Sequence, residues 1–260
     1  MVTIEVAPGV RLESLTTGSG TPVTVFAHGL AGGIADTRPL GGAVAGSRVF
    51  FQFRGHGAST APAGAWTYQD LADDLRGVAD ATGATRAVGV SLGAGALCRL
   101  LAAEPTRFDR IVLFLPAVLD EPRPAAARTR LGGLLRAIAS ADRDAVAAEV
   151  ATEVPAELRG TSAARAFITL RTTALLGSGL GASLAGLPDQ TAVDSAEPLK
   201  AVTAEALVIG CRGDTLHPAE TAERVADLLP RATLHVYDEP HPLWRHRHDL
   251  RERISTFLNS

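Results

Sequence analysis

Short apolar segments alternate with helix-like segments through the first half of the chain. Residues 23–27, 48–53 and 86–90 are rich in β-branched and aromatic side chains and end in glycine-rich turns, which is typical of strands buried on both faces. Residues 67–81, between the second and third of these runs, have apolar side chains at helical spacing. Strands separated by helices of this length form βαβ units, so the alternation predicts an α/β protein with a mainly parallel sheet.

The alternation stops at Asp120 and resumes near residue 201. The segment between them, 121–200, has helical periodicity but no convincing strand. An insertion of about 80 residues is too long for an ordinary crossover between neighbouring strands, so we expect a helical cap over one end of the sheet. The predicted core then consists of residues 1–120 and 201–260, and the predicted cap of residues 121–200.

Composition and charge narrow the class of function. The chain has 25 basic and 28 acidic residues, so its formal net charge is −3. This charge argues against binding to duplex nucleic acid, which needs a basic face. The longest apolar run, residues 111–119, contains a proline and is far shorter than the roughly 20 residues of a membrane span. The first eight residues lack a basic start and a long apolar stretch, so no secretory signal is expected. We therefore expect a small-molecule substrate, no nucleic-acid or membrane partner and a cytoplasmic location, while the oligomeric state stays open.

The cysteine and glycine patterns bear on cofactors. Cys98 and Cys211 lie far apart and have no metal-ligand spacing, which argues against a disulfide framework and favours a reducing compartment. No G-x-G-x-x-G motif follows the early strands, so a dinucleotide-dependent oxidoreductase is not expected. We expect neither a metal nor an organic cofactor.

The strongest local motif is G-x-S-x-G at Gly89–Gly93, between the expected strand 86–90 and an apolar helix at 92–103. A serine at a sharp strand-to-helix turn needs small neighbours, because the backbone there is strained and crowded. The turn lifts the hydroxyl above the sheet and directs the helix N-terminus at it. An ordinary glycine-rich turn is the alternative interpretation. The flanking strand and helix favour Ser91 as a nucleophile.

Two other loops end at the same edge of the predicted sheet. The glycines after His28 would let the backbone approach a substrate oxygen, so the amide of Leu30 can pair with that of Leu92 as an oxyanion hole. The segment 54–59 is expected to form a tight structural turn. Since His28 and His56 both precede the serine on such loops, we expect them to shape the site rather than to act as the base.

These segments resemble those of capped α/β-hydrolases of the esterase and lactonase kind, and the resemblance covers nearly the whole chain. The matching segments are His28-Gly29, RGHGAS at 54–59, GVSLG at 89–93, the strand and acid at 207–214, and the histidine at 241. In that family the order along the chain is serine, acid, histidine, which Ser91, Asp214 and His241 obey. The resemblance implies a mostly parallel sheet with helices on both faces, a helical cap and hydrolysis of a small ester or lactone through an acyl-enzyme.

The triad assignment leaves alternatives for two of its members. An imidazole must take the serine proton, and a carboxylate must orient the imidazole. Asp214 is the expected acid, with Asp120 as the alternative. His241, after the last expected strand, is the expected base, with His217 as the alternative. The remaining late histidines are expected within a strand or at a solvated helix start, and a metal site among them is not favoured: His235, His246 and His248.

Two positions depart from the family pattern. Relatives usually have a glycine before the final histidine, where this chain has Pro240. They also usually have an aspartate two residues before the arginine of RGHG, where this chain has Gln52, so the orientation of Arg54 stays open.

The expected cap contains one aromatic residue, Phe167, and its leucines and alanines suggest an apolar pocket without strong polar recognition. Its arginines could recognise a charge, but we expect them on solvated helix faces: Arg123, Arg128, Arg165 and Arg171. The same constellation also cleaves thioesters and carbon–carbon bonds, so these reactions and a non-catalytic ligand-binding protein remain alternatives to ester or lactone hydrolysis.

Overall fold

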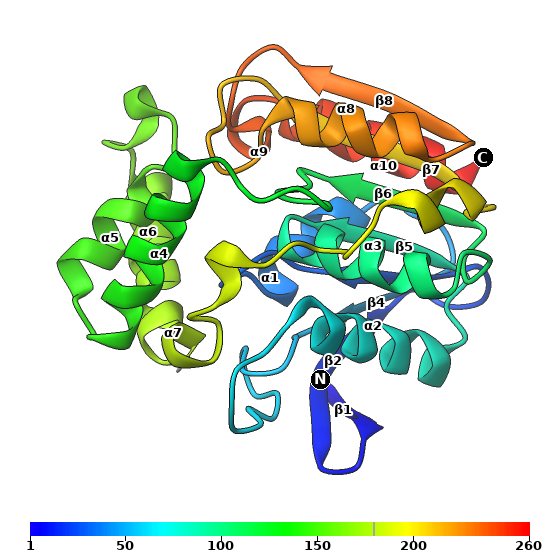
Figure 1. Ribbon diagram of the computed structural model, residues 1–260, viewed down its shortest axis with the longest axis horizontal. Coiled ribbons are helices and arrows are strands. Elements are labelled where there is room, and N and C mark those ends of the chain that lie inside the picture. Colours follow the sequence, from blue (N-terminus) through cyan, green and yellow to red (C-terminus); the bar gives the residue numbers. More distant parts are fainter. Residues whose placement is uncertain (179) are drawn as a thin grey trace.

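The computed structural model describes residues 1–178 and 180–260. This part of the chain forms an eight-stranded sheet with the strand order β1-β2-β4-β3-β5-β6-β7-β8 (Figure 1). The strands are β1 (Val2–Ala7), β2 (Val10–Thr17), β3 (Val23–Ala27), β4 (Ser47–Phe51), β5 (Arg86–Val90), β6 (Arg110–Phe114), β7 (Glu205–Cys211) and β8 (Ala232–Tyr237). The pairs β1–β2 and β2–β4 are antiparallel, and all the others are parallel. The predicted α/β fold with a mostly parallel sheet is confirmed.

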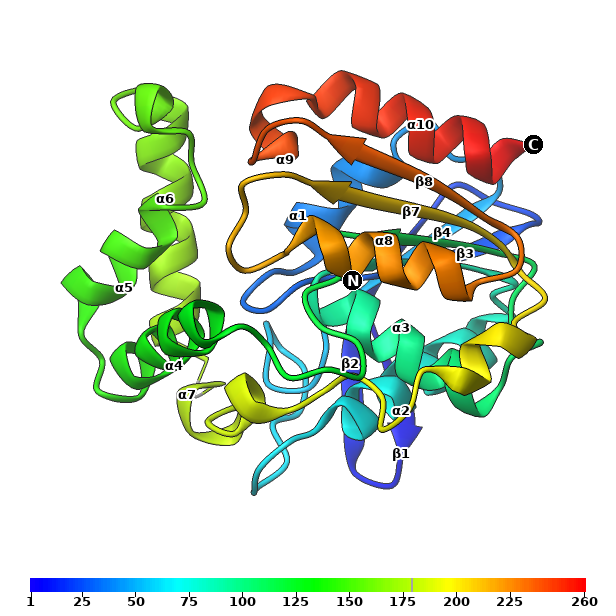
Figure 2. The same ribbon diagram turned by 45° about the horizontal axis from the view of Figure 1, so that its top comes forward.

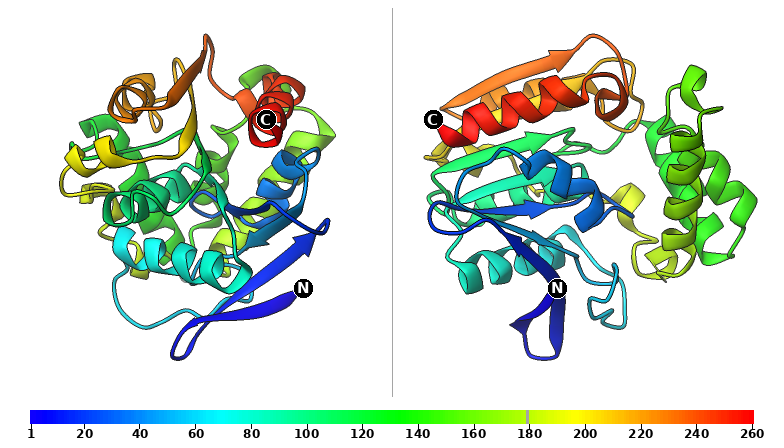
Figure 3. Two further views of the ribbon diagram at one scale, coloured as in Figure 1. Left: turned by 90° about the vertical axis from the view of Figure 1, so that its right-hand side faces the viewer. Right: turned by 180° about the vertical axis from the view of Figure 1, so that it is seen from behind.

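Helices cover both faces of the sheet (Figures 2 and 3). One face carries α2 (Tyr68–Thr82), α3 (Leu92–Ala103) and α8 (Ala219–Leu228), and the other carries α1 (Ile34–Thr37), the 3-10 turn Arg38–Gly41 and α10 (Arg247–Asn259). Alternation along β6 fills both cores, because Ile111 and Leu113 pack on the first side while Val112 and Phe114 pack on the second. Among the described residues, no helix is both long and apolar enough to span a membrane.

Among its described residues, the segment between β6 and β7 consists of helices and loops and contains no strand. It contains α4 (Ala125–Ala139), α5 (Arg143–Ala151), α6 (Ser162–Leu176) and α7 (Leu180–Ser183), which lie together beyond one end of the sheet (Figures 1 and 2). The side chains of Asp142 and Thr161 cap α5 and α6 by accepting backbone N–H groups. We call α4–α7 the inserted helices. The division of the chain into a core and a cap stays a prediction.

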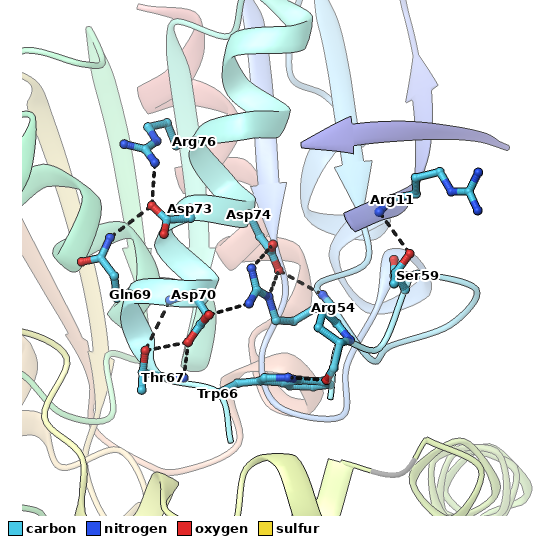
Figure 4. Close-up of polar contacts among 12 residues, drawn as sticks. Arg11, Arg54, Ser59, Trp66, Thr67, Gln69, Asp70, Asp73, Asp74 and Arg76 are labelled. Carbon is cyan, nitrogen blue, oxygen red and sulfur yellow. Dashed lines mark hydrogen bonds and ion pairs between the residues drawn. The ribbon is translucent and has the colours of Figure 1, made fainter. Parts of the chain in front are cut away.

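The loop after β4 is fixed by an ion-pair cluster with α2 (Figure 4). The Arg54 guanidinium donates to both carboxylate oxygens of the fully buried Asp74, at 3.0 and 2.8 Å, and to Asp70 at 2.6 Å. Burial alone would lower the pKa of Arg54, but the hydrogen bonds and charges of these two carboxylates raise it. Helix α2 therefore supplies the counter-charges that position 52 lacks, and Arg54 keeps a defined orientation.

Candidate active site

Ser91 occupies the turn between β5 and α3 in a strained backbone conformation. Its φ and ψ are +50° and −107°, and its N–H donates to the Phe114 carbonyl at 2.9 Å. The flanking glycines are required sterically. A Cβ at Gly89 would lie 2.6 Å from the Gly93 carbonyl oxygen, and one at Gly93 would lie 2.5 Å from that of Ala27. The G-x-S-x-G pattern thus reflects the crowding at this turn.

Two hydrogen bonds join Ser91, His217 and Asp214 in one chain. The Ser91 hydroxyl lies 2.8 Å from His217 Nε2, and His217 Nδ1 lies 2.9 Å from Asp214 Oδ2. With the Nδ1–H donating to the carboxylate, Nε2 is left to accept the serine proton. This is the geometry in which an imidazole can activate a hydroxyl nucleophile.

The turn after β7 brings His217 onto the carboxylate of Asp214. Asp214 Oδ1 accepts the backbone N–H groups of Leu216, at 2.8 Å, and of His217, at 3.2 Å. These bonds fold the chain back on itself, as an aspartate does in a tight turn, and leave Oδ2 for the ring. Burial alone would raise the pKa of Asp214, but the charge and hydrogen bond of His217 and the two backbone N–H groups hold it well below its usual value. Asp214 is therefore ionised.

His241 lies at the same cavity but outside this chain of hydrogen bonds. It precedes α9 (Pro242–Arg245) with φ +67°, and its ring forms no hydrogen bond with any described residue. Burial lowers the pKa of His241, while the charge of Asp214 opposes that shift. The structure thus differs from the expectation for the base: it places His217 between Ser91 and Asp214. The reason is the local turn at Asp214, which a comparison of chain order alone does not show.

The other candidate acid and histidines lie away from Ser91. Asp120 is bound by the Arg224 guanidinium at 2.9 and 3.1 Å and by the Ala196 N–H. His235, His246 and His248 are absent from the cavity lining described below. The His246 ring stacks on Tyr237, and His248 is almost fully exposed. Within the described residues, no group of three or more His, Cys, Asp or Glu side chains could hold a metal ion.

His28 and His56 support the loop that follows β3. His28 Nε2 accepts the Phe53 N–H at 3.0 Å, and His56 Nε2 accepts the Ala31 N–H at 3.3 Å. Each Nδ1 faces a backbone carbonyl, so both rings are bonded as neutral imidazoles. Burial lowers the pKa of His28 well below its usual value and that of His56 to about 4.

The candidate oxyanion hole lies beside Ser91. Gly29 approaches so closely that a Cβ there would lie 3.3 Å from Ser91 Cβ. Leu30 and Leu92 both line the cavity, and the Leu92 N–H belongs to the first turn of α3, where amides lack helical acceptors. From the inserted helices, Arg171 donates to the carbonyls of Leu30 at 3.1 Å and Ala31 at 3.3 Å. The loop that carries Leu30 is therefore held from both the core and the inserted helices.

A cavity of about 600 Å³ extends from Ser91 between the core and the inserted helices. Phe167 of α6 and Trp244 of α9 meet edge to face in its wall, with ring centroids 5.5 Å apart. Beside leucines, the lining contains five arginines: Arg123, Arg130, Arg171, Arg247 and Arg251. The expectation of solvated arginines holds for Arg128 and Arg165, which are exposed. It is wrong for Arg123, which is buried, and for Arg171, whose side chain is 16% exposed.

Comparison with known proteins places the chain in a family. The model of the alpha/beta hydrolase fold family matches residues 22–243, so the chain belongs to the α/β-hydrolase family and is a hydrolase. This confirms the family that the sequence resembles. No curated protein sequence matches the chain significantly.

Solved structures of low sequence identity share the fold over nearly their whole length. An esterase from Exiguobacterium antarcticum is 19% identical, with a TM-score of 0.78 and 99% of each chain covered. The enol-lactonase from Burkholderia xenovorans LB400 is 19% identical, with a TM-score of 0.81, and covers 99% of this chain and 100% of its own. A meta-cleavage product hydrolase from Pseudomonas fluorescens IP01 is 21% identical, with a TM-score of 0.75. Its alignment covers 100% of this chain and 97% of the other chain.

Proposed function

We propose that this hydrolase cleaves a small carboxylic ester or lactone through an acyl-enzyme on Ser91. The observation that carries the proposal is the hydrogen-bonded chain from the Ser91 hydroxyl through His217 to Asp214, which opens on the cavity. A nucleophile within hydrogen-bond reach of a base that a third group orients is the signature of nucleophilic catalysis. The resemblance in fold to an esterase and an enol-lactonase supports this class of substrate.

The mechanism assigns one role to each side chain. His217 Nε2 takes the proton as Ser91 Oγ attacks the carbonyl carbon, and the tetrahedral intermediate puts negative charge on the carbonyl oxygen. The amides of Leu30 and Leu92 are the donors we assign to that oxygen. The His217 imidazolium, stabilised by ionised Asp214, returns the proton to the leaving alkoxide. Water then attacks the acyl-enzyme, again with His217 as base, and Ser91 is restored.

The inserted helices act in this proposal as a cap over the substrate. Arg171 connects α6 to the loop that carries Leu30, and the Trp66 N–H donates to the Ser183 carbonyl at 2.8 Å. Phe167 and Leu131 contribute to the cavity wall from the same helices. In this proposal the inserted helices also exclude water from the active site. Changes within them should therefore alter the choice of substrate.

Labelling with a fluorophosphonate probe tests the nucleophile. The wild-type protein should gain one covalent adduct that peptide mass spectrometry maps to Ser91, and Ser91→Ala should gain none while unfolding at an unchanged temperature. His217→Ala should label at least 100-fold more slowly, whereas His248→Ala, which changes an exposed imidazole, should label normally. Folded wild-type protein that does not react would favour a non-catalytic ligand-binding protein.

The reaction type requires a substrate panel. Esters and lactones should be hydrolysed most efficiently, and the same panel should contain thioesters and a carbon–carbon substrate of the vinylogous diketone class. The carbon–carbon substrate is included because a meta-cleavage product hydrolase shares the fold. A kcat/KM for that substrate above those for all esters and lactones would replace the proposed substrate class while retaining the triad.

A further inference from the structure

Two buried arginines of the described chain differ in how their charge is balanced. Arg54 and Arg123 are 7% and 6% exposed. Arg54 pairs with Asp74 and Asp70, whereas Arg123 has no carboxylate within 4.0 Å among the described residues. A buried charge without a counter-charge is costly, so an unpaired guanidinium in a folded protein calls for an explanation.

Neutral oxygens hold Arg123 in place without cancelling its charge. Nη1 donates to the carbonyls of Leu187 at 2.8 Å and Gln190 at 2.7 Å, and Nη2 donates to the Tyr68 hydroxyl at 2.8 Å. A guanidinium has five N–H groups, and those on Nε and the second on Nη2 find no acceptor in the described part of the chain. Because Arg123 lines the cavity, its uncancelled charge can act on a bound molecule.

The cavity as a whole has an excess of positive charge, although the chain has a formal net charge of −3. Its five arginines face three carboxylates, those of Asp36, Glu153 and Asp214. Asp36 and Glu153 pair with Arg171, and Asp214 pairs with His217. Arg130 pairs with Glu149, whereas Arg247 and Arg251 form no ion pair with any described residue. A low-dielectric cavity lined by one sign of charge attracts ligands of the opposite sign.

We propose that the substrate carries a carboxylate group remote from the scissile bond, and that Arg123 binds this carboxylate. The assignment rests on the proposed function, because it places the carbonyl of the same molecule at Ser91. Arg123 is pre-oriented by Leu187, Gln190 and Tyr68, so binding does not require ordering of the side chain. Arginine suits this role, since its planar group can donate two hydrogen bonds to one carboxylate.

Matched substrates test the proposal on the intact enzyme. Monomethyl esters of succinate, glutarate and adipate are compared with esters of the same length in which a carboxamide replaces the free carboxylate. For at least one length, kcat/KM should be about 10- to 100-fold higher for the anionic ester, the range expected for charged hydrogen bonds. Equal or lower kcat/KM values for the anionic esters at every length would overturn the proposal.

Substitutions identify the arginine responsible. Arg123→Gln should lower kcat/KM far more for the anionic esters than for the carboxamide esters and so remove most of this preference, and Arg123→Lys should keep part of it. Arg128→Gln is the matched control, because Arg128 belongs to the same segment but is exposed and pairs with Asp189. A preference that persists in Arg123→Gln and disappears in Arg247→Gln or Arg251→Gln would overturn the assignment to Arg123. If the Arg123 variants fail to fold, the wild-type comparison still tests the substrate class.

Binding to Ser91→Ala separates this proposal from the proposed function. Trp244 lines the cavity, so its fluorescence should report bound monomethyl ester. Tighter binding of the anionic ester than of its carboxamide, by about tenfold or more, supports the carboxylate site even if the wild-type protein hydrolyses neither compound. Hydrolysis of both esters without any such difference in binding would retain the proposed function and refute the carboxylate site.

Discussion

The loop after β7 and the loop after β8 each bring one histidine to the same cavity, but only one of these histidines is hydrogen-bonded to Ser91. In the first loop, Asp214 accepts two backbone N–H groups and so turns His217 towards Ser91. In the second, His241 stands between Pro240 and Pro242, and its ring has no hydrogen-bond partner in the described chain. A turn of only four residues, Asp214 to His217, thus brings a carboxylate and an imidazole together beside Ser91.

The largest expected effect separates the two histidines. His217→Ala should reduce kcat about 10⁴-fold, because no base remains within reach of the serine proton, whereas His241→Ala should reduce it less than about tenfold. The double variant Ser91→Ala/His217→Ala should be no slower than either single variant, since the residues act as one unit. Steady-state kinetics with thermal unfolding as a control provides the measurement. A severe loss in His241→Ala with little loss in His217→Ala would reverse the comparison.

The second prediction concerns Asp214, the carboxylate that binds His217 within the loop after β7. Asp214→Asn should lower kcat by about 10³- to 10⁴-fold, because the ring loses both its orienting acceptor and the charge that stabilises the imidazolium. The lowered pKa of Asp214 means that it stays ionised as the pH falls towards 5, so protonation of this carboxylate should not limit kcat/KM in that range. Asp120→Asn is the control and should keep nearly full activity. A similar loss in both variants would favour a general structural effect.

The loop after β3 is held by contacts from the inserted helices, whereas the Asp214 turn is held by contacts within one loop. Substitution of Arg171 tests whether the contacts from the inserted helices are equally important for activity. Arg171→Gln should lower kcat about 10- to 100-fold with a smaller change in KM, because two carbonyls beside the candidate oxyanion hole lose their donor. Arg171→Lys should restore part of kcat, and Arg165→Gln on the exposed surface of α6 should change neither constant. A pure increase in KM would instead indicate that Arg171 only binds substrate.

The smallest expected effect concerns the histidines that do not face the nucleophile. Burial lowers the pKa of His56 from 6.5 to about 4, so between these pH values the unfolded chain takes up a proton that the folded protein does not. Stability should therefore fall as the pH is lowered, by roughly 2 kcal/mol between pH 7 and pH 5 for this residue. Urea unfolding at several pH values measures the slope. His56→Gln should make the slope less steep, with the buried His28 accounting for part of what remains. A slope unchanged by that substitution but lost in His248→Gln would contradict the assignment.

Local sequence determined the elements and the turn that carries Ser91. The β-branched runs, the capping pair Thr67 and Asp70 and the small residues around Ser91 specify a strand, a helix start and a tight turn through sterics and hydrogen bonds between near neighbours. The long interruption of strands between Asp120 and β7 likewise follows from periodicity alone. For these features the amino-acid order contains the physical cause.

Tertiary structure determined which distant side chains meet. The position after the last expected strand favoured His241, yet the turn at Asp214 places His217 at Ser91, 126 residues away along the chain. Arg54 found its carboxylates on α2, and Arg123, expected on a solvated helix face, lies buried against the carbonyls of Leu187 and Gln190. Periodicity and turn chemistry act over a few residues, whereas such contacts depend on how strands from separate parts of the chain align their loops at one edge of the sheet.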